Sequence, residues 1–444
     1  MRRPGPIEFC IAFRQSARHR RAGKCLWFGL EQAMGWILET LGDTAMLLSR
    51  DGVPILAADP WLSGSACFGS WARERDLAPG SIKSLLRAPY AFLSRGSDGR
   101  LHLPSLKAMG RGCDILLPGN FDAQHSRMLE AEGFATRILP HKQWVEIVAG
   151  LRLMCVESEY GAILALDADG LLILNKNDSP FCGEERFFRK LTRAHARSYL
   201  LALPETAFPG EKSAAVRDLG RACDLLGVTH YAASEPHIHR REDSRWADAG
   251  RVSWADVARH WKSAAKPIEP YAKIALAIPA MISSPAFVAS SAEAALSGTC
   301  DDDWSELLSA ADWFTLDCFV KGATPFRRGL DFVAFNVGGE LRRIPLRARA
   351  ARKPLAKQRG LVFAAPRKSL IESVTQRRFG ELLDAGFVRL ELVNLESYPL
   401  GGFRRAAVSG AGASPASRLI PAWGQILRRA GHAAPSYRIG AASR

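Results

Sequence analysis

Long apolar runs are missing from this sequence of 444 residues. No stretch reaches the roughly 18 apolar residues that a membrane-spanning helix needs. The basic start, Met1-Arg2-Arg3, is not followed by the apolar segment and small-residue cleavage site of a signal peptide. The sequence therefore predicts neither a membrane span nor a secretory leader, and we expect a cytoplasmic protein.

Paired cysteines and two common catalytic motifs are missing as well. The nine cysteines are odd in number and form no Cys-x-x-Cys pair, which favours free thiols over a disulfide framework or a zinc ribbon. Neither the G-x-S-x-G nucleophile elbow nor the G-x-x-x-x-G-K-S/T phosphate loop occurs. No serine-hydrolase or P-loop chemistry is therefore predicted.

What the sequence has in excess is positive charge, with a formal net charge of +15. Such a charge can attract nucleic acid, an anionic metabolite or a membrane surface. The basic residues gather in two segments, 14–24 and 341–359, and neither segment alternates with the aromatic side chains of single-strand binding platforms. We therefore expect solvated arginine-rich surfaces and no nucleic-acid partner.

The order of predicted elements indicates an α/β protein. We expect a helix over 25–42, a β-hairpin formed by 44–49 and 53–62, and a third strand at 89–94. Helices and strands then alternate, and several strands are apolar throughout, which implies that both faces of their sheets are covered. The predicted fold is a four-layer αββα sandwich with an additional C-terminal α+β region.

A proline-punctuated stretch at 262–273 suggests a boundary between these parts. The sequence predicts a basic arm and helix at 1–41, followed by a sandwich domain at 42–265. A C-terminal α+β region at 270–408 and a less ordered tail at 409–444 complete the predicted division.

The segment GDTAMLLSRDGVPILAADPWLSGSACFGSW (42–71) places two apolar runs around an Asp-Gly turn and ends its second run in Asp-Pro-Trp-Leu. It resembles the opening hairpin of metallo-β-lactamase-fold proteins, in the branch that holds lactonase-like and CMP-N-acetylneuraminate hydroxylase-like members. The resemblance covers residues 42–260. The hydroxylases also use a Rieske iron–sulfur centre, whose Cys-x-His pairs are absent here.

In that family the third strand leads into a metal-binding turn, S-H-x-H-x-D-H, followed in this branch by L-H-x-P-T/S-L. Residues 94–106 align with both parts without a gap. Arg95 and Ser97 stand at the first two histidine positions, Gly99 at the aspartate position and Arg100 at the last histidine position. The resemblance therefore implies a degenerate metal-binding motif.

Two further ligand positions follow from the resemblance. LLILNKNDSP (171–180) is similar to the strand that carries the bridging metal aspartate, which would be Asp178. The preceding strand should end near a histidine, but Glu157 and Glu159 stand there. Zinc or iron in this fold needs several neutral imidazoles and a carboxylate, so the sequence predicts that no metal is held and that no cofactor is used.

Arginine cannot give up its charge at physiological pH, so Arg95 and Arg100 would repel a divalent cation. One or both arginines could instead form an ion pair with Asp178. Alternatively, the two arginines, His102 and Asp178 could line a pocket, and that pocket would hold an anionic small molecule. Asp98 is expected to form an Asx-turn, and Asp59 to support the turn by hydrogen bonding. The favoured hypothesis is thus a non-metal binding protein or pseudo-hydrolase, with a small anion or a protein as its partner.

The alternative hypothesis is an active metal-dependent hydrolase or oxygenase with relocated ligands, acting on a phosphate- or sugar-bearing metabolite. Its zinc or iron ligands would come from the remaining acidic residues and histidines: Asp98, His102, Asp178, His230, His237 and His239.

Overall fold

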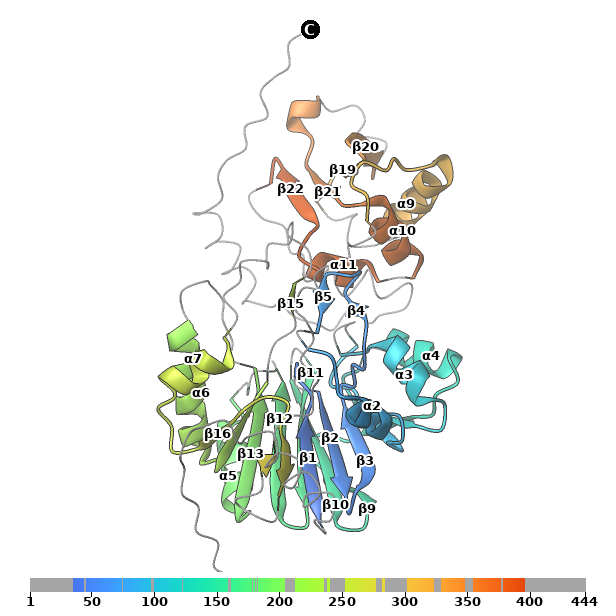
Figure 1. The fold of residues 1–444 in the computed structure, drawn as a ribbon. Coiled ribbons are helices and arrows are strands. Elements are labelled where there is room, and N and C mark those ends of the chain that lie inside the picture. The colour runs from blue at the N-terminus through green and yellow to red at the C-terminus, as the bar shows by residue number, and fades with distance from the viewer. Residues whose placement is uncertain are drawn as a thin grey trace, which may run out of the picture.

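The computed structural model describes the following residues: 35–43, 45–73, 75–96, 100–121, 123–158, 161–177, 179, 181, 183–203, 212–234, 238–239, 252–276, 282–283, 302–322, 329–347, 354–376 and 378–395. Helices and four β-sheets of eight, seven, three and four strands make up these parts of the chain (Figure 1). The predicted mixed α/β content is confirmed. Within the described ranges, no helix is both long and apolar enough to cross a membrane.

The first large sheet is formed mainly by the N-terminal part of the chain. Its strands, in spatial order, are β18 (Ile282–Ser283), β17 (Lys273–Ala275), β1 (Trp36–Thr40), β2 (Met46–Arg50), β3 (Val53–Ala58), β6 (Tyr90–Phe92), β7 (Asp114–Pro118) and β8 (Thr136–Leu139). The predicted hairpin is confirmed, because β2 and β3 pair antiparallel around an Asp51-Gly52 turn. From β3 to β8 the pairs are parallel, so these strands end at one edge.

The second large sheet follows in the chain. Its strands, in spatial order, are β16 (Lys266–Ile268), β14 (His230–Ala233), β13 (Arg197–Ala202), β12 (Leu171–Asn177), β11 (Gly161–Ala168), β10 (Leu151–Ser158) and β9 (Val145–Val148). The strands β9 to β12 pair antiparallel, whereas β12, β13, β14 and β16 pair parallel.

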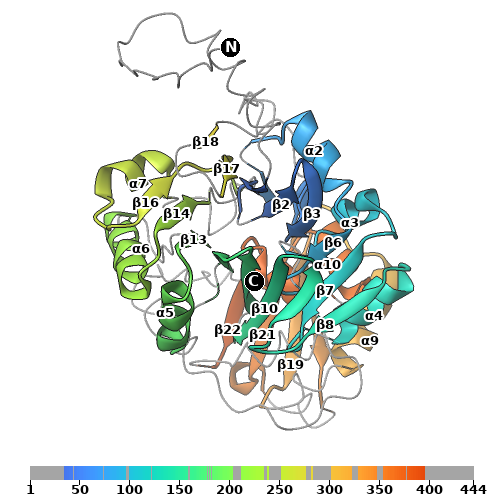
Figure 2. The same cartoon turned by 90° about the horizontal axis from the view of Figure 1, so that it is seen from below.

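The two large sheets share an apolar layer between them. One cluster of buried residues joins Leu48 and Phe92 of the first sheet to Leu164 and Leu201 of the second. Helices cover the outer face of each sheet (Figure 2). They are α2 (Pro79–Leu85), α3 (Leu103–Met109) and α4 (Ala123–Ala131) on the first sheet, and α5 (Glu185–Arg193), α6 (Lys212–Leu226) and α7 (Trp254–His260) on the second.

The C-terminal region has its own sheet and core. It consists of α9 (Ala310–Gly322), β19 (Phe332–Val337), β20 (Glu340–Pro345), the 3₁₀ turn η3 (Leu355–Lys357), β21 (Gly360–Ala364), α10 (Arg367–Thr375), α11 (Phe379–Asp384) and β22 (Arg389–Val393). Cys67 is buried in this core, and Phe68 and Trp71 pack against it. Trp71 belongs to a small sheet of β4 (Ser65–Ala66), β5 (Trp71–Ala72) and β15 (Ile238–His239), and Cys67 and Phe68 lie in the turn between β4 and β5. This sheet stands between the C-terminal region and the large sheets in Figure 1.

The helix predicted over 25–42 is wrong where the structure describes it, because residues 36–40 form β1. Four of its five residues are buried, and the strand lies between β2 and β17. A short apolar run that is buried on both sides has no period that separates strand from helix. The strands β1 and β17 pair within the first sheet. The first sheet therefore contains one strand that precedes residue 42 and one that follows residue 265, the two limits predicted for the sandwich domain.

Candidate functional site

The turn that resembles the metal-binding motif follows β6, at the edge where parallel strands of both large sheets end. Asp59 follows β3, Ser94 follows β6, and Asn177 is the last residue of β12. Of the turn itself, residues 97–99 lie outside the described residues, and with them Asp98.

Asp59 is 2% exposed and holds the start of this turn. Its carboxylate accepts hydrogen bonds from the Ser94 backbone N–H at 2.8 Å, from Ser94 Oγ at 2.8 Å and from Asn177 Nδ2 at 2.5 Å. Burial raises the pKa of the Asp59 carboxyl, and the charge of Arg100 and these hydrogen bonds oppose that rise. The three side chains tie β3 and β6 of the first sheet to β12 of the second.

Arg100, at the last histidine position of the motif, is 4% exposed. Its Nη1 lies 3.2 Å from Asp43 Oδ2 and also donates to the Asp43 carbonyl. Asp43 is buried in the turn between β1 and β2, with a left-handed φ of 47°. A buried charge needs a partner, and the ion pair with Asp43 holds Arg100 in place.

Arg95, which the resemblance aligns with the first histidine, is half-buried beside the start of β11. Gly161, the first residue of β11, has a φ of 145°, and a Cβ there would lie 2.9 Å from the Ser94 carbonyl oxygen and 3.3 Å from Arg95 Cβ. The second sheet therefore presses directly against the candidate site turn. Asp178, the residue expected to pair with Arg95 or Arg100, lies outside the described residues.

His102 is 3% exposed and immediately precedes α3. Its Nε2 lies 3.3 Å from the Ser65 carbonyl oxygen, so Nε2 carries the hydrogen, and Nδ1 accepts from Ser105 Oγ at 2.7 Å. Burial lowers the pKa of His102 to about 4, and the positive charges of Arg378 and Arg73 add to that effect. Both ring nitrogens are thus engaged within the protein, and the ring is neutral at pH 7.

The C-terminal region contacts the same turn through α11. Glu381 Oε1 lies 3.3 Å from His125 Nε2 on α4, and Glu381 Oε2 accepts from Arg378 Nη2 at 2.6 Å. A Cβ at Gly96 would lie 2.6 Å from His125 Nδ1, so the histidine packs against the site turn. Although burial opposes it, the hydrogen bond from His125 and the charge of Arg378 hold the pKa of Glu381 below its usual value.

Sequence reasoning missed Asp43, Asn177 and Glu381. Asp43 is 57 residues from Arg100 in the chain, and no signal in the sequence pairs them. Glu381 is 256 residues from His125 in the chain, so no spacing rule could connect them.

The relocated ligands of the alternative hypothesis do not converge in the described part of the chain. His230 begins β14, and because β12 and β14 run parallel it lies at the edge opposite Asn177. His237 lies outside the described residues, and only the backbone of His239 is described. Among the described side chains, no group of three or more His, Cys, Asp or Glu could hold a metal ion.

A metal therefore does not fit the side chains described at this edge. Arg100 brings a fixed cation, both nitrogens of His102 are hydrogen-bonded, and Asp59 already accepts three hydrogen bonds.

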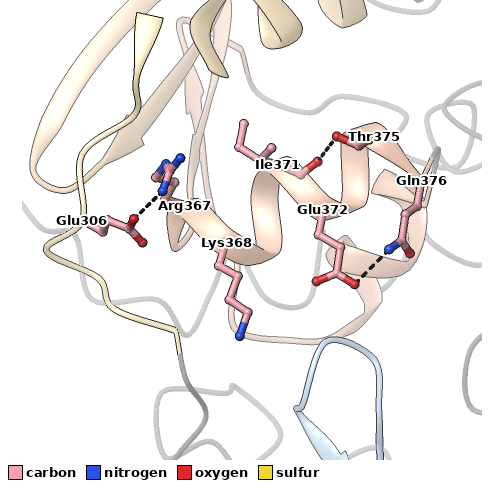
Figure 3. A pocket seen from close by; sticks show the side chains of 7 residues that line it. All are labelled: Glu306, Arg367, Lys368, Ile371, Glu372, Thr375 and Gln376. Atoms are coloured by element: carbon pink, nitrogen blue, oxygen red, sulfur yellow. Dashed lines mark hydrogen bonds and ion pairs between the residues drawn. The ribbon is translucent and has the colours of Figure 1, made fainter. Parts of the chain in front are cut away.

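Two hollows lie elsewhere on the molecule. One, of about 460 Å³, is lined by Glu306 and by residues of α10, where Arg367 pairs with Glu306 and Glu372 with Gln376 (Figure 3). The other, of about 800 Å³, is lined by Arg197, His230 and Lys266 among others. Neither is lined by Arg95 or Arg100.

Comparison with known proteins gives structural likenesses only. No protein-family model matches the sequence, and no curated protein matches it. Similar solved structures include CmlA, a diiron β-hydroxylase from Streptomyces venezuelae, at 10% identity and a TM-score of 0.35, covering 46% of this chain and 45% of that one. This chain thus matches less than half the length of CmlA.

Two hydrolases are also similar. Isothiocyanate hydrolase from Delia radicum gut bacteria is 12% identical, with a TM-score of 0.37, covering 53% of this chain and 96% of that one. A protein of Thermotoga maritima, described as a Zn-dependent hydrolase of the metallo-β-lactamase superfamily, is 10% identical, with a TM-score of 0.29, covering 53% and 98%. With TM-scores below 0.5, these likenesses carry no argument about activity.

The buried ion pair generates a first prediction. Arg100→Met should lower the free energy of unfolding by about 3–5 kcal/mol, because it removes the cation that contacts the buried Asp43 carboxylate. Asp43→Asn should also destabilise, and the double variant should lose less than the sum of the two. Urea unfolding of all three measures this coupling. The exposed Arg87→Met is the control and should stay within about 0.5 kcal/mol of the wild type.

The neutral ring of His102 generates a second prediction. The unfolded chain protonates this histidine near pH 6.5 and the folded protein near pH 4, so the unfolded state binds more protons between these values. The free energy of unfolding should therefore fall as the pH drops from 6.5 to 4, with roughly 3 kcal/mol of the loss due to His102.

His102→Asn, which can still accept from Ser105, should flatten that dependence. Urea unfolding at several pH values tests this, with His260→Asn as the control. An unchanged pH profile in His102→Asn would show that the ring does not stay neutral in the folded protein.

Proposed function

We propose that the chain is a metallo-β-lactamase-like protein of four-layer αββα architecture that works as a non-metal binding protein. The observation that carries this proposal is the buried ion pair of Arg100 with Asp43. In the proposal, Arg100 occupies the position of a metal-ligating histidine. The sandwich domain would extend from 35 to 283, so that it includes β1, β17 and β18, and the C-terminal α+β region would follow. We also propose a cytoplasmic location.

Electrostatics supports the absence of metal chemistry in this proposal. The guanidinium of Arg100 keeps its charge at any physiological pH, and it lies close enough to Asp59 to affect the pKa of that carboxyl. A divalent cation at the same place would meet this fixed charge in a poorly solvated environment, where repulsion is strong. The polar groups of the turn would then serve to join the two sheets.

The ligand in this proposal is a small anion. Arg95 is the half-buried arginine of the turn, and its planar guanidinium suits bidentate contacts to a carboxylate or phosphate. The contact of α11 with the turn, through Glu381 and His125, suggests that the C-terminal region forms one wall of the site. A protein partner remains a second possible occupant of this surface, and nucleic acid is not proposed.

Metal analysis combined with anion binding tests the proposal. The full chain, loaded with excess zinc, iron and manganese and then desalted, should retain far less than one metal ion per chain. In a thermal-shift screen, one or both of citrate and a nucleotide sugar should stabilise the metal-free protein. The stabilisation should disappear in Arg95→Ala and persist in Arg87→Ala.

Stoichiometric metal that is lost on mutation of Asp178 would overturn the proposal and support the hydrolase hypothesis. An equal thermal shift in wild type and Arg95→Ala would remove the anion pocket at this turn.

A further inference from the structure

The opposite edge of the second sheet carries a row of two cationic side chains and a histidine. Arg197, His230 and Lys266 are the first residues of the parallel strands β13, β14 and β16. In the sheet register His230 lies beside Lys266 on one side and beside Tyr199 on the other. Paired positions of parallel strands share a face, so Lys266, His230 and Tyr199 face the same way, and Arg197 joins them two residues before Tyr199.

That face is the apolar inner face of the sheet. Tyr199, Ala232 and Ile268 belong to the core between the two large sheets, so His230 and Lys266 continue the same face at its rim. Charged residues at the end of an otherwise apolar face need an explanation, because packing alone does not call for them. Figure 2 shows β13, β14 and β16 side by side at this part of the molecule.

The ring of His230 is held in one position. It stacks on Tyr199, with 4.7 Å between ring centroids and 19° between ring planes. Thr229 Oγ1 lies 2.8 Å from the Ser198 carbonyl oxygen and 2.9 Å from His230 Nδ1. In the tautomer with a hydrogen on Nδ1, the Thr229 hydroxyl donates to the carbonyl and accepts from the ring, and Nε2 carries the lone pair.

His230 also remains neutral near pH 7. Burial lowers its pKa, and the charges of Lys266 and Arg197 lower it further. Tyr199 is the other titratable group against the ring, and burial raises the pKa of its hydroxyl, so it carries no charge there. The site thus combines two cations with a neutral hydrogen-bond acceptor.

A hollow of about 800 Å³ lies at these residues, large enough for a small metabolite. Asp224 is the acidic side chain in its lining, and its Oδ1 accepts from Ser263 Oγ at 2.7 Å and from the Ala264 N–H at 3.0 Å. Arg197 is anchored by a hydrogen bond of 3.1 Å from Nη1 to the Leu276 carbonyl. Lys266 is exposed at the rim.

We propose that this hollow binds a phosphate group, either inorganic phosphate or a phosphate monoester. Lys266 and Arg197 contact the anionic oxygens, and His230 Nε2 accepts the hydrogen of the protonated oxygen. A phosphate group near neutral pH offers both kinds of oxygen, because its second pKa is about 6. A fully ionised carboxylate offers no such hydrogen and leaves Nε2 without a donor.

The phosphate site is distinct from the site proposed around Arg95. Arg197, His230 and Lys266 begin parallel strands of the second sheet, whereas the Arg95 turn lies where β12 of that sheet ends. A charge change at one edge should therefore leave binding at the other nearly unchanged.

Calorimetric titration of the full chain tests the proposal, at pH 7 and constant ionic strength in chloride. Inorganic phosphate and phenyl phosphate are the two ligands. Lys266→Gln should weaken binding at least tenfold, and His230→Phe, which keeps the ring stack, at least about fivefold. Lys262→Gln, on the neighbouring loop, and Arg95→Ala should bind as the wild type does.

Binding of both ligands indicates a site for free phosphate, and binding of phenyl phosphate alone indicates a site for a phosphorylated metabolite. If neither ligand binds at concentrations up to about 10 mM, the proposal is overturned. So does equal binding by wild type and Lys266→Gln. Imidazole ¹⁵N spectra, assigned with His230→Phe, should show a hydrogen on Nδ1 and a change at Nε2 when phosphate is added.

Discussion

A buried guanidinium must have its charge balanced inside the protein, and the pair of Arg100 with Asp43 meets this requirement. Once Arg100 is fixed in this way, the edge where the strands of both sheets end holds a permanent positive charge. The neighbouring groups are consistent with that charge. Asp59 is satisfied by three donors, and the ring of His102 is neutral and hydrogen-bonded at both nitrogens.

The same edge also connects parts of the chain that lie far apart in sequence. Asn177 bonds to Asp59 across the two large sheets, and Glu381 reaches His125 from the C-terminal region. The small sheet adds a third connection, since Cys67 is buried in the C-terminal core. These contacts use many of the polar groups at this edge to hold the structure together.

The sequence was sufficient to predict the hairpin of β2 and β3 and the mixed α/β content. Those features depend on local period and turn residues. The replacement of metal-ligating histidines by Arg95 and Arg100 stays a prediction from a short motif. The strand β1 was mistaken for a helix because its neighbours in the sheet, and not its own period, decide its conformation. The partners of Arg100 and His125 come from distant segments, and only the folded chain brings them together.

The two edges of the sandwich thus differ in what they leave available: one is filled by ion pairs, whereas the other keeps a hollow with cations and a histidine acceptor. The most direct test of the central claim is a crystal structure of the full chain soaked in zinc, with anomalous data collected at the zinc edge. The account predicts no anomalous peak at the turn after β6, and Arg100 Nη1 still within ion-pair distance of Asp43. A strong peak at that turn, with Arg100 displaced from Asp43, would contradict it.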